Sequence, residues 1–340
     1  MTDAVRRRTF GVLLALLPAA LLLATAAGSV PLPLRPLLAS LGSALGVGSG
    51  DTLDPTAATI LWSVRLPRVL LAALVGGGPA VVGSALQSVF RNPLANAGLL
   101  GVSSGASLGA VLAVNLGWAA HVFLALPLMA FAGATAAVAL VYLLAHAGGR
   151  PTLHGLLLTG LAVAALASAG TSLMLAATEE FRVRTVLFWL AGGLEGRSWA
   201  HVRLAAAFIL TGAASLFALA RPLDLLALGE DEAAALGLPV HLARMTILTL
   251  AALIAGAATS VAGSIPFVGL VAPHALRPLV GPLGRRLLPA AFLGGALLVV
   301  LADLASRTLS DRIDLPLGSL TAFVGAPYFL VALRAQEGRS

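Results

Sequence analysis

Long apolar runs recur along this chain and leave little sequence between them. Only 10% of the residues are charged, whereas soluble domains carry about 25%. A helix needs about 20 apolar residues to cross a bilayer, and the runs have helical rather than alternating character. We therefore predict an all-α integral membrane protein with about ten transmembrane helices. In windows of about 19 residues, the ten segments lie near 10–28, 66–86, 98–117, 121–145, 155–177, 200–220, 242–262, 267–281, 287–306 and 317–334.

Ten crossings would place both termini on one side of the membrane, and the arginines indicate that this side is the cytoplasm. Three arginines, residues 6–8, precede the first apolar run, and basic residues are enriched in cytoplasmic loops. The arginines of the other inner loops follow the same rule: Arg91, Arg150, Arg221, Arg244, Arg277, Arg285 and Arg286. The first run could also be the core of a signal peptide, but residues 10–27 are long enough to span, so we expect a retained helix.

Composition excludes several classes of site. The chain has no cysteine, and all of its 21 basic residues are arginine. Without lysine there is no Walker A loop, so any ATP that drives this protein is bound by a partner. The histidines show no HExxH spacing and lie in separate loops and span ends, so we expect no metal site and no enzyme activity in this chain. The net charge of +7 follows from the positive-inside rule and does not indicate nucleic-acid binding.

Three connections within this single transmembrane domain, residues 1–340, are long enough to fold. Residues 29–57 are expected to form an outer loop with one short helix. Residues 178–199 hold an apolar stretch too brief to span and bounded by charges and tryptophan, which is typical of an interfacial or re-entrant helix. Residues 221–241 are acidic and helix-forming on the inner side, so we expect a soluble partner to press against them.

A weak internal repeat is also visible. The stretch "GLLGVSSGAS" (98–107) opens the second span of the group 66–177, and "PFVGLVAPHA" (266–275) opens the second span of the group 242–334. The two groups begin on opposite sides of the predicted membrane, as inverted repeats do.

The stretch "VRLPRVLLAALVGGGPAVVGSALQSVFRNPLANAGLLGVSSGASLGA" (64–110) resembles the signature region of the FecCD-type permeases, the membrane subunits of ABC importers for ferric siderophores, haem and cobalamin. Further blocks in the family's order are "LLALGEDEAAALGLPV", "SIPFVGLVAPHALRPLVGPLGRRLLPA", "LLVVLADLASRTL" and "DLPLGSLTAFVGAPYFLVALR". The resemblance implies a type II ABC importer permease that works as a homodimer in a bacterial inner membrane. It also implies two cytoplasmic ATPase subunits, which bind ATP and Mg²⁺, one periplasmic binding protein, and no cofactor on this chain.

The resemblance assigns roles at the outer end to Arg65, Arg68 and Arg307, which match arginines that meet acidic residues of the binding protein. Arginine suits this role because its guanidinium pairs with carboxylates in a bidentate manner. Two alternatives remain at this stage. An arginine at a span end also reaches lipid headgroups, and Asp303 lies four residues before Arg307, so these two side chains can pair within one helix.

The resemblance also assigns an inner gate and a coupling segment. In "NPLA", Asn92 and Leu94 match gate positions, although Pro93 alone accounts for the turn. The second gate position departs from the cobalamin permease and places Leu153 and His154 there. Gln87 is a candidate for the pathway lining, or it binds a neighbouring helix. The residues matching the helices that seat in the ATPase are Leu228, Gly229, Glu230, Asp231, Glu232, Ala235, Leu236 and Gly237.

Three classes of function can be compared on the sequence. A gradient-driven transporter needs acidic residues or ion sites within its spans, and here the clear candidate is Asp303, one turn from Arg307. A membrane-embedded enzyme lacks a paired-carboxylate or metal-ligand pattern. The expected function is thus an ATP-driven importer permease. Because the chain most resembles the haem-importing branch, haem is the expected cargo, with ferric siderophores or cobalamin as the alternatives.

Overall fold

The computed structural model describes residues 3–28, 32–44, 46, 53–146, 152–309 and 315–337, with side chains as far as 331. Within these ranges the chain is helical and contains no strand. In chain order the elements are α1 (Asp3–Ala26), α2 (Leu34–Ala44), α3 (Pro55–Thr59), the π-helical turn η1 (Ile60–Arg65), α4 (Leu66–Val89), the 3-10 turn η2 (Ala97–Leu100), α5 (Val102–Asn115), α6 (Trp118–His121), α7 (Ala125–His146), α8 (Leu153–Ala176), α9 (Glu180–Ala191), α10 (Trp199–Ala218), α11 (Ala220–Leu228), α12 (Glu230–Ala235), α13 (Val240–Ala262), α14 (Val268–Val280), α15 (Gly284–Thr308) and α16 (Leu317–Glu337).

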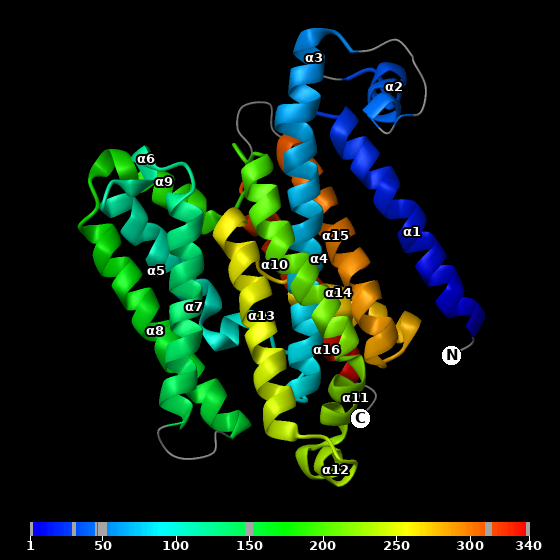
Figure 1. Ribbon diagram of the computed structural model, residues 1–340, viewed down its shortest axis with the longest axis vertical. Coiled ribbons are helices and arrows are strands. Elements are labelled where there is room, and N and C mark those ends of the chain that lie inside the picture. Colours follow the sequence, from blue (N-terminus) through cyan, green and yellow to red (C-terminus); the bar gives the residue numbers. More distant parts are fainter. Residues whose placement is uncertain are drawn as a thin grey trace.

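A helix stands at each of the ten expected membrane segments. Seven helical stretches of the described chain are long and apolar enough to span, and α3, η1 and α4 together form one of them. The other three segments are shorter apolar helices, α5, α14 and the apolar part of α16. Figure 1 shows the long helices side by side, with α2, α3, α6 and α9 at one end and α11 and α12 at the other. The chain is therefore an all-α membrane protein.

Two of the expected spans are shorter than the sequence indicated. α5 has 14 residues and α14 has 13, so α5 covers only about 21 Å at 1.5 Å per residue. Each begins directly after a residue in the left-handed conformation, Gly101 at φ 74° and Phe267 at φ 67°, which breaks the helix on that side. The first part of each crossing is thus irregular backbone held inside the bundle, where neighbouring helices can satisfy its polar groups.

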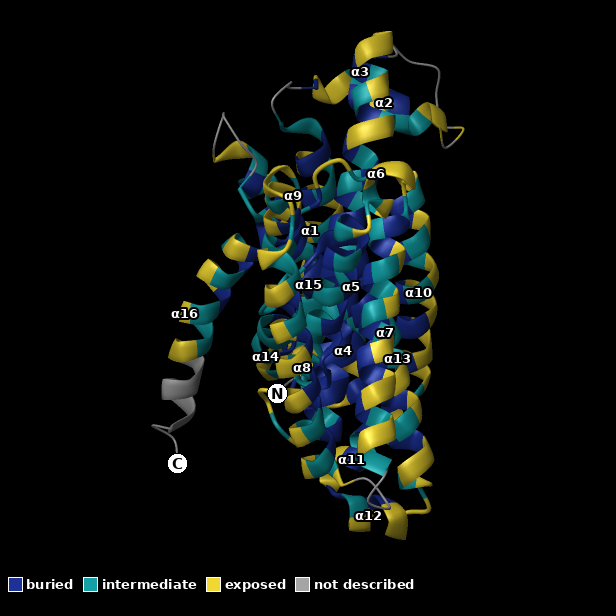
Figure 2. Ribbon diagram, turned by 90° about the vertical axis from the view of Figure 1, so that its left-hand side faces the viewer, coloured by how far each residue is buried: buried dark blue, intermediate teal, exposed yellow. Residues whose placement is uncertain are grey.

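The most buried of the long helices is α4, which lies at the centre of the bundle (Figures 1 and 2). It packs against α10, α13, α14 and α15. Glycines allow the closest approaches: a Cβ atom at Gly83 would collide with the carbonyl oxygen of Gly269 on α14, and one at Gly76 with that of Gly295 on α15. Close backbone contact through small residues is how membrane helices associate without a hydrophobic driving force.

The two groups of helices have matching neighbours. α5 packs against α7 and α8, as α14 packs against α15 and α16, while α4 packs against α15 and α13 against α7. In Figure 1 α4 runs away from the end that carries α9, whereas α13 runs toward it. The order of contacts and the opposite directions are those of an inverted repeat.

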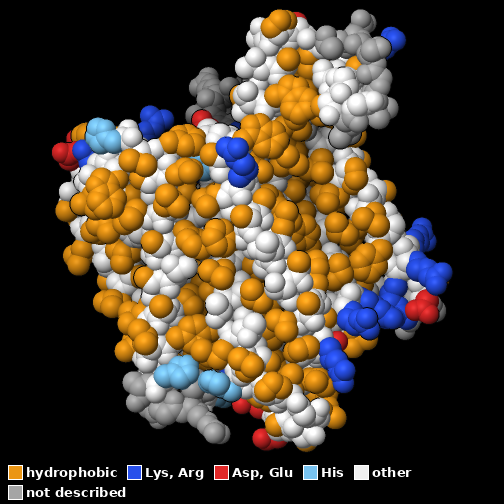
Figure 3. Space-filling model, viewed as in Figure 1, with side chains coloured by type: hydrophobic (Ala, Val, Ile, Leu, Met, Phe, Trp, Pro, Cys, Tyr) orange, Lys and Arg blue, Asp and Glu red, His pale blue; other side chains and the backbone are white. Residues whose placement is uncertain are grey.

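The outer surface of the bundle is apolar. Figure 3 shows hydrophobic side chains over most of this face, with the charged groups near its upper and lower ends and along its right-hand edge. On α8, Leu158, Leu161, Leu166 and Leu173 are all more than half exposed. Side chains of this kind on an unpaired helix face are those that lipid or a second membrane helix would cover.

Candidate functional site

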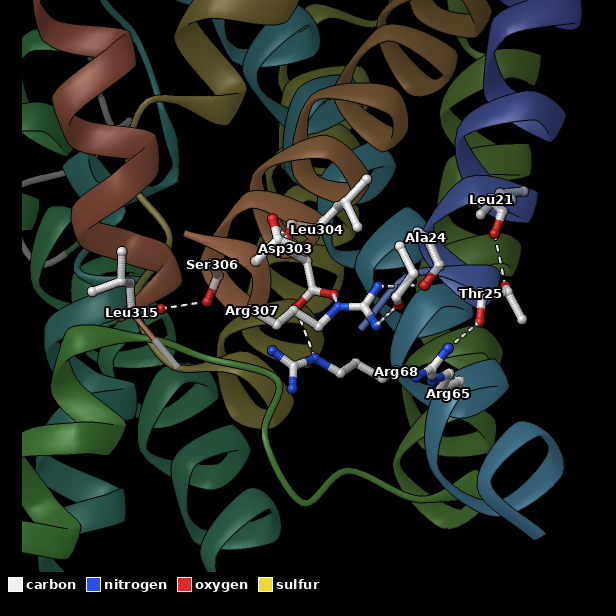
Figure 4. A network of polar contacts seen from close by, with 12 residues as sticks. Leu21, Ala24, Thr25, Arg65, Arg68, Asp303, Leu304, Ser306, Arg307 and Leu315 are labelled. Atoms are coloured by element: carbon white, nitrogen blue, oxygen red, sulfur yellow. Dashed lines mark hydrogen bonds and ion pairs between the residues drawn. The ribbon is translucent and has the colours of Figure 1, made fainter. Parts of the chain in front are cut away.

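At the end of the bundle that carries α9, Arg65 and Arg307 bind the C-terminal end of α1 (Figure 4). Arg65 Nη1 donates to the carbonyl oxygens of Thr25 (2.9 Å) and Ala26 (2.7 Å). Arg307 donates to the carbonyl oxygens of Ala24 (2.5 Å, Nη2) and Ala27 (3.2 Å, Nη1). The last carbonyls of a helix have no partner within it and carry partial negative charge, so two guanidinium groups here cap α1 and anchor it to α15 and the α4 segment.

A buried carboxylate, that of Asp303, links Arg307 to a third arginine, Arg68. Asp303 on α15 is 1% exposed, and its Oδ1 accepts from Arg68 Nε at 2.8 Å. Its Oδ2 lies 3.2 Å from Arg307 Nε in the same helix. The pairing of Asp303 with Arg307 was visible in the sequence as a four-residue spacing. The pairing with Arg68 was not, because the two residues are 235 positions apart.

The structure thus brings together all three arginines for which docking was expected, but it turns them inward. Arg65 is 5% exposed, and the side chains of Arg68 and Arg307 are 13% and 8% exposed. In this arrangement they bind α1 and Asp303, so their first role is to hold the outer ends of α1, α4 and α15 together. Docking of a binding protein at these arginines remains a prediction.

At the opposite end, α11 and α12 form a compact projection (Figure 1). Glycines at both ends of α12 adopt conformations that other residues rarely adopt, Gly229 at φ 147° and Gly237 at φ 83°. Glu230 at the start of α12 accepts from Arg244 of α13 at 2.6 Å. On α11, the carboxylate of Asp224 accepts from the backbone N–H of Gly284 at 2.6 Å, which ties this helix to the start of α15.

The surface of this projection combines apolar and acidic side chains. Leu228 and Leu236 are 60% and 62% exposed, on either side of α12. Asp231 and Glu232 are exposed between them, while Ala233 is fully buried against the bundle. A rigid turn with exposed leucines around exposed carboxylates is typical of a contact surface for a soluble protein.

The "NPLA" turn links α4 to η2 at the same end. Asn92 accepts from the backbone N–H of Leu94 at 2.8 Å through its side-chain oxygen. Its own N–H donates to the carbonyl of Gln87 at 3.2 Å, and its carbonyl accepts from Ala95 at 3.1 Å. The turn is thus fixed by local hydrogen bonds, and it leaves Leu94 42% exposed.

The other two expected gate residues lie on a separate surface. Leu153 and His154 open α8 and line a cavity of about 850 Å³ together with Glu230 and Arg244. Arg91 reaches this cavity from the end of α4, but Asn92 and Leu94 are not among the described residues that line it. The structure therefore places Leu153 and His154 beside the first residue of α12 and does not join the two pairs into one cluster.

Gln87 binds two neighbours inside the bundle. Its Oε1 accepts from Arg277 Nη2 of α14 at 2.8 Å, and its Nε2 donates to the carbonyl of Gly269 at 3.4 Å. The side chain is 4% exposed. Of the two interpretations open from the sequence, the structure shows the contact with a neighbouring helix.

Among the described residues, no group of three or more His, Cys, Asp or Glu side chains is placed to hold a metal ion. Three histidines do line the 850 Å³ cavity beside the start of α8: His146, His154 and His241. The His146 and His241 rings meet edge to face, with centroids 5.8 Å apart.

Comparison with known proteins adds what geometry alone does not give. The sequence profile of the FecCD transport family matches residues 15–335. The chain belongs to the FecCD transport family. Members of this family are permease subunits of ABC transporters, and ATP hydrolysis resides in a separate subunit. This chain is accordingly a transport subunit and not an enzyme.

FecCD relatives with different named cargoes match it about equally well. The chain is 41% identical over 285 residues to the cobalamin import system permease of Halobacterium salinarum, covering 84% of this chain and 76% of that protein. It is 41% identical to the hemin transport system permease of Yersinia pestis (82% and 85% covered) and 42% identical to the Fe(3+) dicitrate permease FecD of Escherichia coli (80% and 84%). It is a permease of an importer for chelated metal, siderophore or cobalamin.

A solved structure supports the architecture. A metal-chelate type ABC transporter in an inward-facing conformation superposes with a TM-score of 0.84 at 32% identity, covering 97% of this chain and 99% of that one. The likeness extends over nearly the whole chain, so the all-α architecture is shared with that transporter.

Proposed function

We propose that this FecCD permease passes an iron-containing chelate, haem foremost, from a periplasmic binding protein across a bacterial inner membrane to the cytoplasm. The match to the hemin permease of Yersinia pestis, which covers more than four-fifths of each chain, supports haem as the cargo. Ferric siderophores and cobalamin are the alternatives, because relatives named for Fe(3+) dicitrate, achromobactin and cobalamin match at 41–42% identity.

The observation that carries the ATP-driven mechanism is the projection formed by α11 and α12. Its glycine-bounded turn exposes Leu228 and Leu236 to the inner side, where a gradient-driven carrier would have no use for such a surface. We assign it as the seat of an ATPase subunit, which binds ATP and Mg²⁺, while this chain binds no cofactor. Movement of α12 would reach α13 through the 2.6 Å pair of Glu230 with Arg244.

A second copy of this chain completes the pathway in this proposal. α16 leans away from the bundle along most of its length (Figure 2), and Phe323 on it is 82% exposed. Together with the exposed leucines of α8, it offers an apolar face suited to a second α16 and α8. The proposed assembly is a homodimer with two ATPase subunits and one binding protein.

The gate and docking assignments are carried forward as parts of the proposal. The "NPLA" turn, with Asn92 and Leu94, and the start of α8, with Leu153 and His154, close the inner end of the pathway. Arg65, Arg68 and Arg307 receive the binding protein at the outer end, where the carboxylates of that protein would compete with Asp303 and the α1 carbonyls.

The cargo is tested with the full complex in proteoliposomes. The chain is co-purified with its ATPase, and binding protein loaded with haem, a ferric siderophore or cobalamin is added in separate reactions. We expect haem-loaded protein to stimulate ATP hydrolysis and to deliver haem to the lumen, followed by its absorbance. Stimulation by another chelate alone would contradict haem and leave the permease assignment intact. Failure of any ATPase to co-purify would contradict the role of α11 and α12.

A further inference from the structure

A cavity of about 600 Å³ opens at the outer end of the bundle, away from α12. It lies between α9, the turn that follows it, Ser306 at the end of α15, and Leu315 and Pro316 just before α16. This volume falls within the range of small-molecule sites, about 300–1,000 Å³. Aromatic and basic side chains make up much of its wall: Arg68, Phe181, Arg184, Phe188, Trp189 and Arg197.

Two buried hydrogen-bond donors belong to residues of this wall and bind no acceptor in the described part of the chain. The Trp189 indole N–H is buried, with the residue 6% exposed, and it binds no atom of the described chain. The Nε atom of Arg197 is likewise buried without an acceptor among the described residues. Leaving such donors unsatisfied in the protein costs free energy unless a ligand or water supplies the acceptor. Neither nitrogen has room beside it for a ligand oxygen in this arrangement, so any donor to a molecule in the cavity comes from the remaining guanidinium nitrogens of Arg184 and Arg197.

The charge of the cavity points to an anion. Arg184 stacks on Phe188, with its guanidinium carbon 5.5 Å from the ring centroid, and neither Arg184 nor Arg197 forms an ion pair with any described carboxylate. Among the described residues that line the cavity, Glu195 is the acidic one, and it is exposed. Burial lowers the pKa of the Arg197 guanidinium below its ordinary value, and an anionic partner would offset the lost hydration.

The frame around these donors is already fixed. The backbone N–H of Gly193 donates to the carbonyl of Ala262 at 2.8 Å, and that of Leu317 donates to the carbonyl of Gly192 at 2.9 Å. The turn after α9 is therefore tied to the end of α13 and to the start of α16. A pre-formed site of this kind avoids the entropy cost of ordering a loop on binding.

We propose that this cavity binds the carboxylate groups of a chelate with a conjugated or aromatic ring as it enters the permease, with Arg184 and Arg197 as donors. The ring would lie against Phe181 and Phe188. An acidic side chain of a docked protein could reach the exposed Arg184, but it would leave the aromatic wall unmatched. The inference deepens the proposed function and rests on it for the identity of the ligand.

The test uses the full-length permease in nanodiscs and two probes, protoporphyrin IX and its dimethyl ester. Binding is followed from the Soret band after subtraction of empty nanodiscs. We expect the free acid to bind more tightly than the ester, and Arg184→Gln and Arg197→Gln each to weaken the acid by about tenfold. Neither substitution should change the affinity of the ester. Arg203→Gln is the matched control. Arg203 is an exposed arginine near the start of α10, at the same end of the bundle as the cavity, and it does not line the cavity.

Trp189→Phe is a second control, since it retains an aromatic ring and removes an N–H that is not open to the cavity. We expect this variant to bind the acid and the ester as the unaltered protein does. Equal affinities for acid and ester in the unaltered protein, or arginine variants that bind like the Arg203→Gln control, would overturn the proposal. Reduced binding of the cargo-free binding protein with unchanged porphyrin affinity would also overturn it, by assigning the arginines to protein docking.

The outcome is separable from the fate of the proposed function. If the arginine variants transport cargo and bind porphyrin with unchanged affinity, the binding role of the cavity is contradicted and the proposed import function stands. The expected porphyrin pattern in a chain that recruits no ATPase would support the cavity and contradict the import mechanism.

Discussion

Replacement of Asp303 by asparagine removes a carboxylate that contacts both Arg68 and Arg307. The residue is 1% exposed, and its two oxygens lie 2.8 Å and 3.2 Å from the two Nε atoms. Breaking a buried ion pair by removing one partner costs about 3–5 kcal/mol, because the other charge stays buried. Arg68 retains some exposure at 13%, so we expect the lower end, about 3 kcal/mol.

The assay is unfolding of the purified chain in mixed micelles with increasing SDS, followed by far-UV circular dichroism. Asp303→Asn is compared with Arg68→Gln and with the double variant, so that the cycle isolates the coupling between these two side chains. We expect the double variant to be more stable than Asp303→Asn, since it no longer carries an arginine that has lost its contact with Asp303. A loss below about 1 kcal/mol, the scale of an exposed pair, would refute the claim that Asp303 anchors α4 to α15.

Three further substitutions test other contacts. Gly83→Ala should destabilise the chain by about 1–3 kcal/mol in the same SDS assay, because its Cβ would collide with the backbone of Gly269; Gly11→Ala, which meets no atom within 4 Å, should have no such effect. Gly229→Ala forces a side chain onto φ 147° at a cost of about 1–3 kcal/mol, and we expect stimulated ATP hydrolysis in proteoliposomes to fall more than binding-protein affinity does. Gln87→Leu leaves Arg277 without its acceptor on α4, and a loss of about 1–3 kcal/mol in SDS unfolding is expected; an unchanged midpoint would show that water satisfies Arg277.

The arrangement of long helices could be predicted from the sequence because lipid imposes a simple rule. A run of about 20 apolar residues with few charges has to be a helix there, and the seven long stretches follow it. The interruption before α14 could not be predicted in the same way. It occurs at Phe267, a residue with no intrinsic preference for positive φ, and packing against Gly325 of α16 accompanies it.

The arginines at the outer end show where local patterns stop being sufficient. The spacing of Asp303 and Arg307 on one helix face predicted their contact. Nothing in the sequence indicated that Arg65 would cap α1, because that contact joins residues 39 and 40 positions apart through backbone carbonyls. Such acceptors exist in every helix end, so only the three-dimensional arrangement identifies which one an arginine binds.

The coupling segment, residues 221–241, could be predicted in part. Glycines around "EDEAAAL" predicted a bounded helical turn, and α12 occupies that stretch. The exposure of Leu228 and Leu236 could not be predicted, because both would read equally well as core residues. Likewise the cavity beside Trp189 combines residues of α4, α7, α9 and α15 with the turn after α9 and the residues just before α16. None of these segments carries a sequence signature of a cavity.

The most direct test of the central claim separates ATP from an ion gradient as the energy source. The chain, its ATPase and loaded binding protein are reconstituted in proteoliposomes, and cargo uptake is measured with ATP supplied to the ATPase side or with an imposed proton gradient alone. The account predicts uptake with ATP only, and its loss when Leu228 and Leu236 are both replaced by Asp. Uptake driven by the gradient without ATP would contradict it.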